Sequence, residues 1–282
     1  MTTNWNLTAD EIATYQRDGL IAPKLRLPDD VHAQMRSAVD KLLRDNEKIA
    51  PESLVCPHIP YGENHDEAAA AQWFAFATQP RILNLVEQLI GSDIVLWGSQ
   101  VFCKPPKIGR EIPWHQDGQY WPIRPIATCS VWIAIDDALP ENGCMRYIPG
   151  SHRSRSVYEH RADTRRDRVL NEEVRPDAFD AASARDDCLN AGEFSLHDVY
   201  LIHGSNANTS AKRRAAYVVR YMPATSLYDR ASPRGVQSQS GVAFSLAARP
   251  IWLLRGQDRA GNDFQTGHGH EYQLSSRASD DV

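Results

Sequence analysis

The first third of the chain carries hydrophobic and polar residues in a helical pattern. Thr8 followed by Glu11 is a capping-box pattern, and Gly19 is placed to end the helix that it opens. Further on, apolar residues recur three or four positions apart, as they do on the buried face of a helix. The sequence therefore predicts helices over residues 8–19, after the Pro28-Asp29-Asp30 cluster, through the alanine run 68–71 and from Pro80 to Gly91.

The pattern changes at Ile94, where short runs of β-branched and aromatic residues begin. Gly, Pro, Asn or Asp residues bound each run, which is typical of strands. Helices followed by many short strands predict an α+β chain with a β-sandwich or barrel core. The expected strands are Ile94 to Cys103, Thr128 to Ile135, Met145 to Ile148, Phe194 to Ile202 and Ala215 to Met222.

The order of these parts favours a single domain over residues 1–282, with a helical part at about 8–91 and a barrel at about 94–256. A charged interval at about 152–187 interrupts the strand pattern. Long insertions of this kind usually run over the surface and often cover a site.

Composition and charge narrow the class of protein. Charged residues make up 24% and hydrophobic residues 42% of the 282 residues, which is an ordinary globular balance. A formal net charge of −5 argues against a nucleic-acid partner, and the absence of an apolar run of roughly 20 residues argues against a membrane span. Five scattered cysteines and an N-terminus without signal-peptide character favour reduced thiols and a cytoplasmic protein.

The candidate chemistry begins at Trp114-His115-Gln116-Asp117. Side chains two positions apart can project from one face of an extended strand, so His115 and Asp117 could bind the same ion. A distant second histidine would complete two imidazoles and one carboxylate, a set that binds Fe(II) on one face and leaves the opposite positions open. An arginine further on could pair with a carboxylate of a cosubstrate.

Two histidines compete for the third ligand position. His197 and His203 lie six positions apart, and strand alternation would place both on one face. We favour His203, because Gly204 beside it permits close approach of other atoms and an arginine pair follows at Arg213-Arg214. His197 is then expected to be a nearby hydrogen-bonding or structural residue.

Three longer stretches resemble the phytanoyl-CoA dioxygenase family. They are residues 114–117, the run 138–152 with Pro140-Glu141-Asn142-Gly143 and Pro149-Gly150-Ser151-His152, and residues 201–223 with Ile202-His203-Gly204-Ser205 and Arg220-Tyr221-Met222-Pro223. The resemblance implies a double-stranded β-helix, which is a jelly-roll or cupin-like barrel, with N-terminal helices packed on it. It also implies an Fe(II)- and 2-oxoglutarate-dependent dioxygenase that uses O2 and releases succinate and CO2.

Carried over residue by residue, the resemblance assigns iron to His115, Asp117 and His203. It assigns 2-oxoglutarate to Arg214, which is favoured over Arg213 by its offset of eleven from His203, and to Ser205, Gln100 and Trp132, with Gln116 and Thr128 as weaker additions. Relatives that halogenate have a small residue in place of the carboxylate, so Asp117 favours hydroxylation.

The substrate is expected to be a small molecule. Candidate contacts are His58, Tyr61, Asn64, His65, Lys104, Tyr120, Trp121 and Arg124. Aromatic rings beside an arginine suit a zwitterion, with an amine over the rings and an acid on the arginine. Relatives that hydroxylate aminoalkylphosphonates look similar through His115 to Arg124, whereas other members act on natural products or acyl-CoAs. Barrel packing is the alternative role for Trp121 and Arg124.

Two other classes of protein fit parts of the pattern. A cupin-like isomerase or hydrolase could use the same three ligands for zinc or manganese, although Arg214 then has no role. A non-catalytic jelly-roll binding module could have lost its metal, although the ligand set is intact. The sequence leaves a homo-oligomer open.

Overall fold

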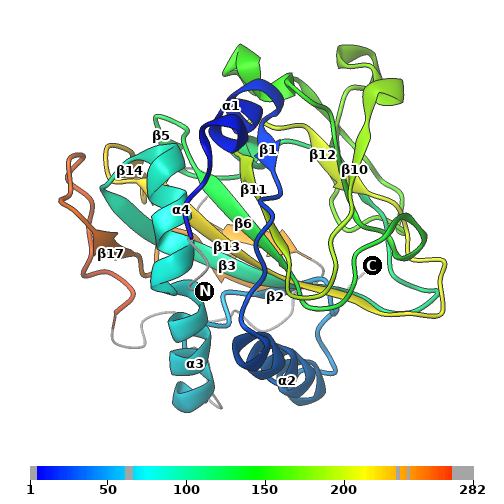
Figure 1. Cartoon of the computed structure of the whole chain (residues 1–282), viewed down its shortest axis with the longest axis horizontal. Coiled ribbons are helices and arrows are strands. Elements are labelled where there is room, and N and C mark those ends of the chain that lie inside the picture. Colours follow the sequence, from blue (N-terminus) through cyan, green and yellow to red (C-terminus); the bar gives the residue numbers. More distant parts are fainter. Residues whose placement is uncertain (1–4, 61–65, 233–235, 240–241, 269–282) are drawn as a thin grey trace.

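The structure is a computed structural model that describes residues 5–60, 66–232, 236–239 and 242–268 (Figure 1). The N-terminal part contains the predicted helices, which are α1 (Ala9–Asp18), α2 (Asp29–Asp45), α3 (Glu67–Ala77) and α4 (Pro80–Ile90). Thr8 and Glu11 form the predicted capping box, and Gly19 ends α1 in the left-handed conformation. None of the described helices combines the length and apolar character that a membrane span requires.

The larger sheet is antiparallel throughout and has the strand order β1-β11-β6-β13-β3-β17, with β2 also paired to β3. Its centre is the long pair β3 and β13, which are paired over their full length with one irregularity in register between Arg220 and Tyr221. The strands are β1 (Leu20–Ile21), β2 (Leu54–Val55), β3 (Ile94–Lys104), β6 (Cys129–Ala134), β11 (Phe194–Asp198), β13 (Arg214–Pro223) and β17 (Trp252–Arg255).

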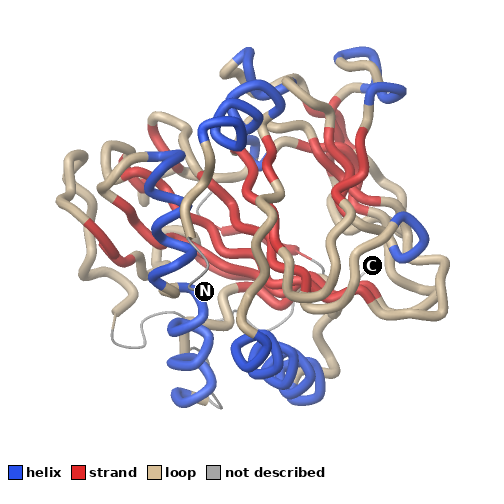
Figure 2. The backbone as a smooth tube through the Cα atoms, viewed as in Figure 1, coloured by secondary structure: helices blue, strands red, loops and turns tan. Residues whose placement is uncertain are grey.

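The smaller sheet is also antiparallel, with the order β10-β7-β12-β4, and its strands form a group separate from those of the larger sheet (Figure 2). Its strands are β4 (Ile112–His115), β7 (Met145–Tyr147), β10 (Arg185–Asp187) and β12 (His203–Ser205). Two antiparallel sheets that face each other confirm the predicted α+β fold with a double-stranded β-helix. Short two-stranded ribbons are added by β5 (Ile123–Arg124) with β14 (Leu227–Tyr228), β8 (His160–Ala162) with β9 (Glu172–Val174), and β15 (Val236–Gln239) with β16 (Val242–Ser245).

Alternation along the central strands separates the two sides of the larger sheet. On β13, Tyr217 and Tyr221 belong to the core shared with the helices, and their hydroxyls donate hydrogen bonds to the carbonyls of Trp73 and Ala77 at α3. Val218 between them belongs to a second core that faces the smaller sheet, together with Met145 of β7. One face of the sheet is therefore covered by helices (Figure 1), while the other is available for a site.

Two features differ from the expected pattern. The run Phe194 to Ile202 was predicted as one strand, but β11 ends at Asp198 and a turn follows, in which the amide of Leu201 donates to the Asp198 carbonyl. The chain then enters the smaller sheet as β12, so His197 and His203 lie on different sheets. Short strands β1 and β2 also lie within the part that was predicted to be helical.

Candidate metal centre

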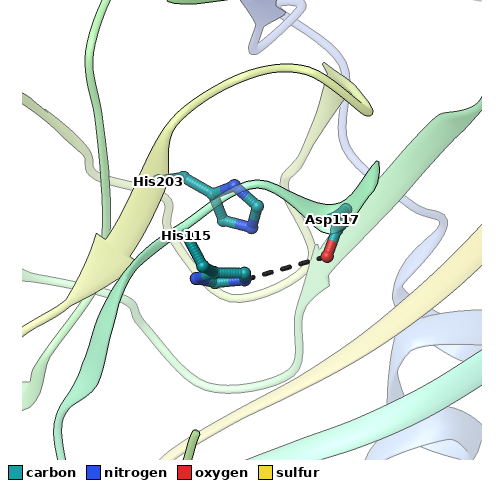
Figure 3. Close-up of side chains that lie close together, drawn as sticks. All are labelled: His115, Asp117 and His203. Carbon is teal, nitrogen blue, oxygen red and sulfur yellow. Dashed lines mark ion pairs between the residues drawn. The ribbon is translucent and has the colours of Figure 1, made fainter. Parts of the chain in front are cut away.

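The two candidate histidines come from neighbouring strands of the smaller sheet, and the candidate carboxylate follows one of these strands. His115 is the last residue of β4, and His203 is the first of β12 and its direct cross-strand partner. Asp117 does not continue the strand as expected from the two-residue spacing, because it opens the 3₁₀ helix η1 (Asp117–Gln119). That turn still brings its carboxylate toward the two imidazoles (Figure 3).

The three side chains are buried and converge closely enough to share one ion. One ligand atom from each residue lies within 4.8 Å of the others. Nε2 of His115 is 3.7 Å from Oδ1 of Asp117, and the two imidazole centroids are 4.2 Å apart. Two imidazoles and one carboxylate with an open side are the donor set that suits non-haem Fe(II).

Backbone carbonyls fix the orientation of both imidazoles. Nδ1 of His115 donates to the Pro113 carbonyl, and Nδ1 of His203 donates to the Leu201 carbonyl, each at 2.9 Å. Because a carbonyl can only accept, each Nδ1 must carry the hydrogen, and Nε2 keeps its lone pair for a metal. Hydrogen bonds of this kind are the usual support of metal-binding histidines.

Burial and neighbouring charges favour the protonation states that metal binding requires. Burial and then the charge of His115 lower the pKa of His203 to about 3, against an opposing effect of Asp117. Burial also lowers the pKa of His115. For Asp117, burial raises the pKa, but the polar contact with His197 and the charges of His203 and Arg220 outweigh it and leave the pKa below its usual range.

His197 lies on the opposite sheet, at the outer oxygen of the carboxylate. Its Nε2 is 3.7 Å from Oδ2 of Asp117, whereas His115 approaches Oδ1. Its ring centroid is 5.1 Å from that of His203. This arrangement agrees with the expected supporting role of His197 rather than with a place among the three ligands.

A cavity of about 600 Å³ opens beside the cluster, between the two sheets. The larger sheet contributes Gln100, Trp132, Val218, Arg214 and Arg220, and the loop before β17 contributes Arg249. The smaller sheet contributes Met145, His115 and His203, and η1 contributes Asp117. Residues Val169–Glu172 of the charged insertion complete the wall, and the amide of Val169 bonds the Glu111 carbonyl beside β4. The insertion thus lines the cavity from the side of the smaller sheet.

Arg214 lies at one part of this cavity, fully buried at the start of β13. Its Nε donates to the Gly143 carbonyl at 3.2 Å, and its guanidinium carbon lies 5.5 Å from the centre of the Trp132 ring. Burial lowers its pKa to about 10, so the group stays charged at neutral pH. Ser205 and Gln100 line the same cavity.

Lys104 lies behind Ser205 and does not line the cavity. Its Nζ donates to Oγ of Ser205 at 2.6 Å, to the Ser205 carbonyl at 3.3 Å and to the Asn206 carbonyl. Burial and then the charge of Arg214 lower its pKa well below the usual value. The structure therefore places Lys104 next to a predicted cosubstrate contact rather than among substrate contacts.

Other candidates lie away from the cavity wall. Gln116 is bound within its loop, donating to the Tyr200 carbonyl at 2.7 Å and accepting from the Tyr158 amide. Thr128 is buried outside the lining. Arg124 points its guanidinium at the carbonyls of Trp121 and Ile123.

Of the remaining substrate candidates, Tyr120 and Trp121 line the cavity. His58 is buried outside it, with Nδ1 2.6 Å from Oγ of Ser99. Tyr61, Asn64 and His65 fall outside the described residues.

Two cavity arginines were not predicted from the sequence. Arg220 follows Arg214 on β13 at an even spacing, so strand alternation could have identified it. Arg249 comes from the loop before β17, and no pattern in the sequence points to it.

A jelly roll with two histidines and a carboxylate on neighbouring strands defines the class of metal-binding barrel proteins. The sequence profile of the phytanoyl-CoA dioxygenase (PhyH) family matches residues 15–216, and the chain belongs to this family.

Several known proteins are similar to the chain. A phytanoyl-CoA dioxygenase domain-containing protein 1 homolog of Caenorhabditis briggsae is 35% identical over 129 residues, covering 44% of this chain and 45% of that protein. A probable alpha-ketoglutarate-dependent hypophosphite dioxygenase of Stutzerimonas stutzeri is 30% identical over 146 residues, covering 51% and 50%. The chain thus spans about half the length of these relatives. The solved structure of the non-heme monooxygenase ThoJ, in its apo form, has a TM-score of 0.69 at 23% identity, covering 96% of this chain and 90% of that one.

Proposed function

We propose that the protein is an Fe(II)- and 2-oxoglutarate-dependent dioxygenase that hydroxylates a C–H bond of a small polar molecule. The observation that carries the proposal is the shared cavity, which His115, Asp117 and His203 line together with the buried cation of Arg214. Bound there, Fe(II) would couple O2 reduction and the conversion of 2-oxoglutarate to succinate and CO2 to oxidation of the substrate.

The 2-oxoglutarate site follows from the charges and donors around Arg214. We assign the distal carboxylate of the cosubstrate to this guanidinium, because a buried arginine with a planar fork of donors is suited to bind a carboxylate. The Ser205 hydroxyl accepts from Lys104, which leaves its own hydrogen to donate to the same carboxylate. Trp132 stacks against the guanidinium and Gln100 lines the adjacent wall.

Asp117 carries the argument for hydroxylation. Its carboxylate occupies the position that a halogenating enzyme would leave to a halide. A cupin-like isomerase or hydrolase could use the same metal ligands, but it would leave Arg214 without a role.

For the substrate we infer a zwitterion, of which an aminoalkylphosphonate is an example. The cavity volume of about 600 Å³ suits a small molecule. Its wall combines the aromatic rings of Tyr120 and Trp121 with a carboxylate at Glu172 and arginines at Arg220 and Arg249. This mixture offers both an acid and an amine a partner of opposite charge.

The proposal is tested by succinate formation. Purified protein supplied with Fe(II), 2-oxoglutarate and O2 is expected to form succinate, and substrates are those compounds that accelerate it. Asp117→Ala should lower the rate by more than about 100-fold, since a ligand of the metal is lost, while Asp45→Ala on the exposed side of α2 should not change it. Equal succinate formation by wild type and Asp117→Ala would refute the metal assignment.

A further inference from the structure

A pair of cations lies in the cavity in addition to Arg214. Arg220 lies on β13, and Arg249 lies in the loop before β17. Both guanidiniums approach the ring of Trp97 on β3, with their central carbons 6.0 Å and 5.6 Å from its centroid. The two arginines are thus neighbours around one indole.

Arg220 is half-buried in the cavity wall and forms no direct ion pair with a carboxylate of the described residues. Among the described residues, no carboxylate lies within 4 Å of it, and its Nε has no hydrogen-bond partner. Its Nη2 donates to Oε1 of Gln100 at 3.2 Å. By contrast, Arg213 on the other face of the strand pairs with Asp136 and Asp40. An uncompensated cation in a cavity is costly, unless a ligand brings the opposite charge.

Neighbouring charges increase this imbalance. Burial lowers the pKa of Arg220, the charge of Asp117 raises it, and the adjacent charge of Arg249 lowers it. Asp117 is the acid that offsets Arg220, yet a bound metal ion would take up the charge of that carboxylate. Arg220 would then be left with the adjacent charge of Arg249, which repels it.

The aromatic surroundings hold Arg220 in a fixed orientation. Its guanidinium carbon lies 5.2 Å from the centroid of Trp121 and 5.8 Å from that of Phe102. The rings of Trp97 and Trp121 are packed edge to face at 4.5 Å. Gly98 leaves room for the guanidinium of Arg249, because a Cβ at position 98 would lie 3.3 Å from Nη1 of Arg249. Such rigidity lowers the entropic cost of binding a ligand.

The pair is separate from the arginine assigned to the cosubstrate. Arg214 and Arg220 are six residues apart on one strand, which corresponds to roughly 20 Å between their Cα atoms at the rise of a β-strand. One small dianion such as 2-oxoglutarate is therefore too short to bind both Arg214 and Arg220.

We propose that Arg220 and Arg249 form an anion subsite that binds the carboxylate or phosphonate group of the substrate. This inference rests on the proposed function, because it takes the molecule that shares the cavity with Arg214 to be 2-oxoglutarate. The subsite replaces Arg124, the sequence-based candidate for the same role, which lies outside the cavity.

The experiment is anaerobic calorimetry on the protein loaded with Fe(II) and saturating 2-oxoglutarate. Three probes carry an amine on a chain of three methylenes: 3-aminopropylphosphonate, 4-aminobutanoate and the neutral-ended 3-aminopropanol. At least one anion should bind about ten-fold or more tightly than the alcohol, as expected for charge-assisted hydrogen bonds. The preferred anion shows whether the subsite suits a phosphonate or a carboxylate.

Variants then test whether Arg220 and Arg249 cause the preference for an anion over the alcohol. Arg220→Gln and Arg249→Gln should each weaken binding of the preferred anion about ten-fold while leaving the alcohol unchanged, and Arg220→Lys should retain part of the preference. The matched control is Arg81→Gln, because Arg81 is exposed and also stacks on a tryptophan, Trp5, and neither residue lines the cavity. The comparison of the anions with the alcohol uses the wild-type protein alone, so it tests the subsite even if a variant fails to fold.

Two failures are distinguishable. If Fe(II) and 2-oxoglutarate do not bind, the proposed function is wrong. If they bind but the alcohol matches both anions, or if the preference survives both glutamine variants, the subsite is refuted and the proposed function stands.

Discussion

Arg213 and Arg214 are adjacent in the chain and face opposite sides of β13. Arg213 pairs with Asp136 and Asp40 under the helices, whereas Arg214 enters the cavity. Arg214→Ala should raise the KM for 2-oxoglutarate about ten-fold or more with a smaller effect on stability. Arg213→Ala should lower the free energy of unfolding by about 1–2 kcal/mol and leave that KM unchanged. Steady-state kinetics and urea unfolding of both variants check this; a reversed pattern would contradict the assignment of the pair.

Lys104 offers a second test at the scale of one residue. Its amino group donates a hydrogen bond to the Ser205 hydroxyl, so Lys104→Met should raise the KM for 2-oxoglutarate several-fold while kcat changes little. The exposed Lys107, three residues on, provides the control Lys107→Met, for which neither constant should change. If Lys104→Met instead lowers kcat several-fold and leaves the KM for 2-oxoglutarate unchanged, Lys104 does not act through the cosubstrate site.

Among the elements, β10 contains a buried acid with an unusual pKa. Asp187 accepts a hydrogen bond from Ser195 of β11 at 2.6 Å, and burial raises its pKa to about 6, against the smaller opposing effects of that bond and of His197. The unfolded chain has a pKa near 3.9, so folding favours the protonated acid and stability falls as the pH rises from about 4 to 6.

Asp187→Asn should remove this pH dependence. The stability advantage of the variant over wild type should grow by about 1 kcal/mol between pH 5 and pH 7.5, because the wild type must bury a charge at the higher pH. Urea unfolding at the two pH values measures it, with Asp186→Asn at the neighbouring position as control. An advantage that is the same at both pH values would show that the burial of Asp187 does not perturb its ionisation.

Strands were predictable where one face is apolar over several residues, as in β3, β6 and β13. The prediction of one strand from Phe194 to Ile202 was wrong. Residues on both sides of the turn at Asp198 are buried, so the apolar pattern continues although the chain passes from one sheet to the other. The same reason applies to Asp117, whose spacing from His115 suits a strand but whose backbone turns into η1. Arg249 reaches the cavity from a loop, and loop paths leave no periodic signal.

At the scale of the whole molecule, the two sheets contribute different residues to the site. The smaller sheet presents His115 and His203 as cross-strand partners, and the larger sheet presents Arg214 and Arg220 from the face opposite the helices. The insertion adds residues 169–172 to the wall. We infer that metal, cosubstrate and substrate meet in the space between the sheets, each held by a different part of the barrel.

The most direct test of this arrangement is an anaerobic absorption titration of the Fe(II)-loaded protein with 2-oxoglutarate. Chelation of Fe(II) by 2-oxoglutarate gives a visible metal-to-ligand charge-transfer band. The band should appear in wild type, require about ten-fold more 2-oxoglutarate in Arg214→Ala, and be weaker in Asp117→Ala at the same Fe(II) concentration, because one metal ligand is lost. A wild-type protein that shows no band, or three proteins that titrate alike, would contradict the account.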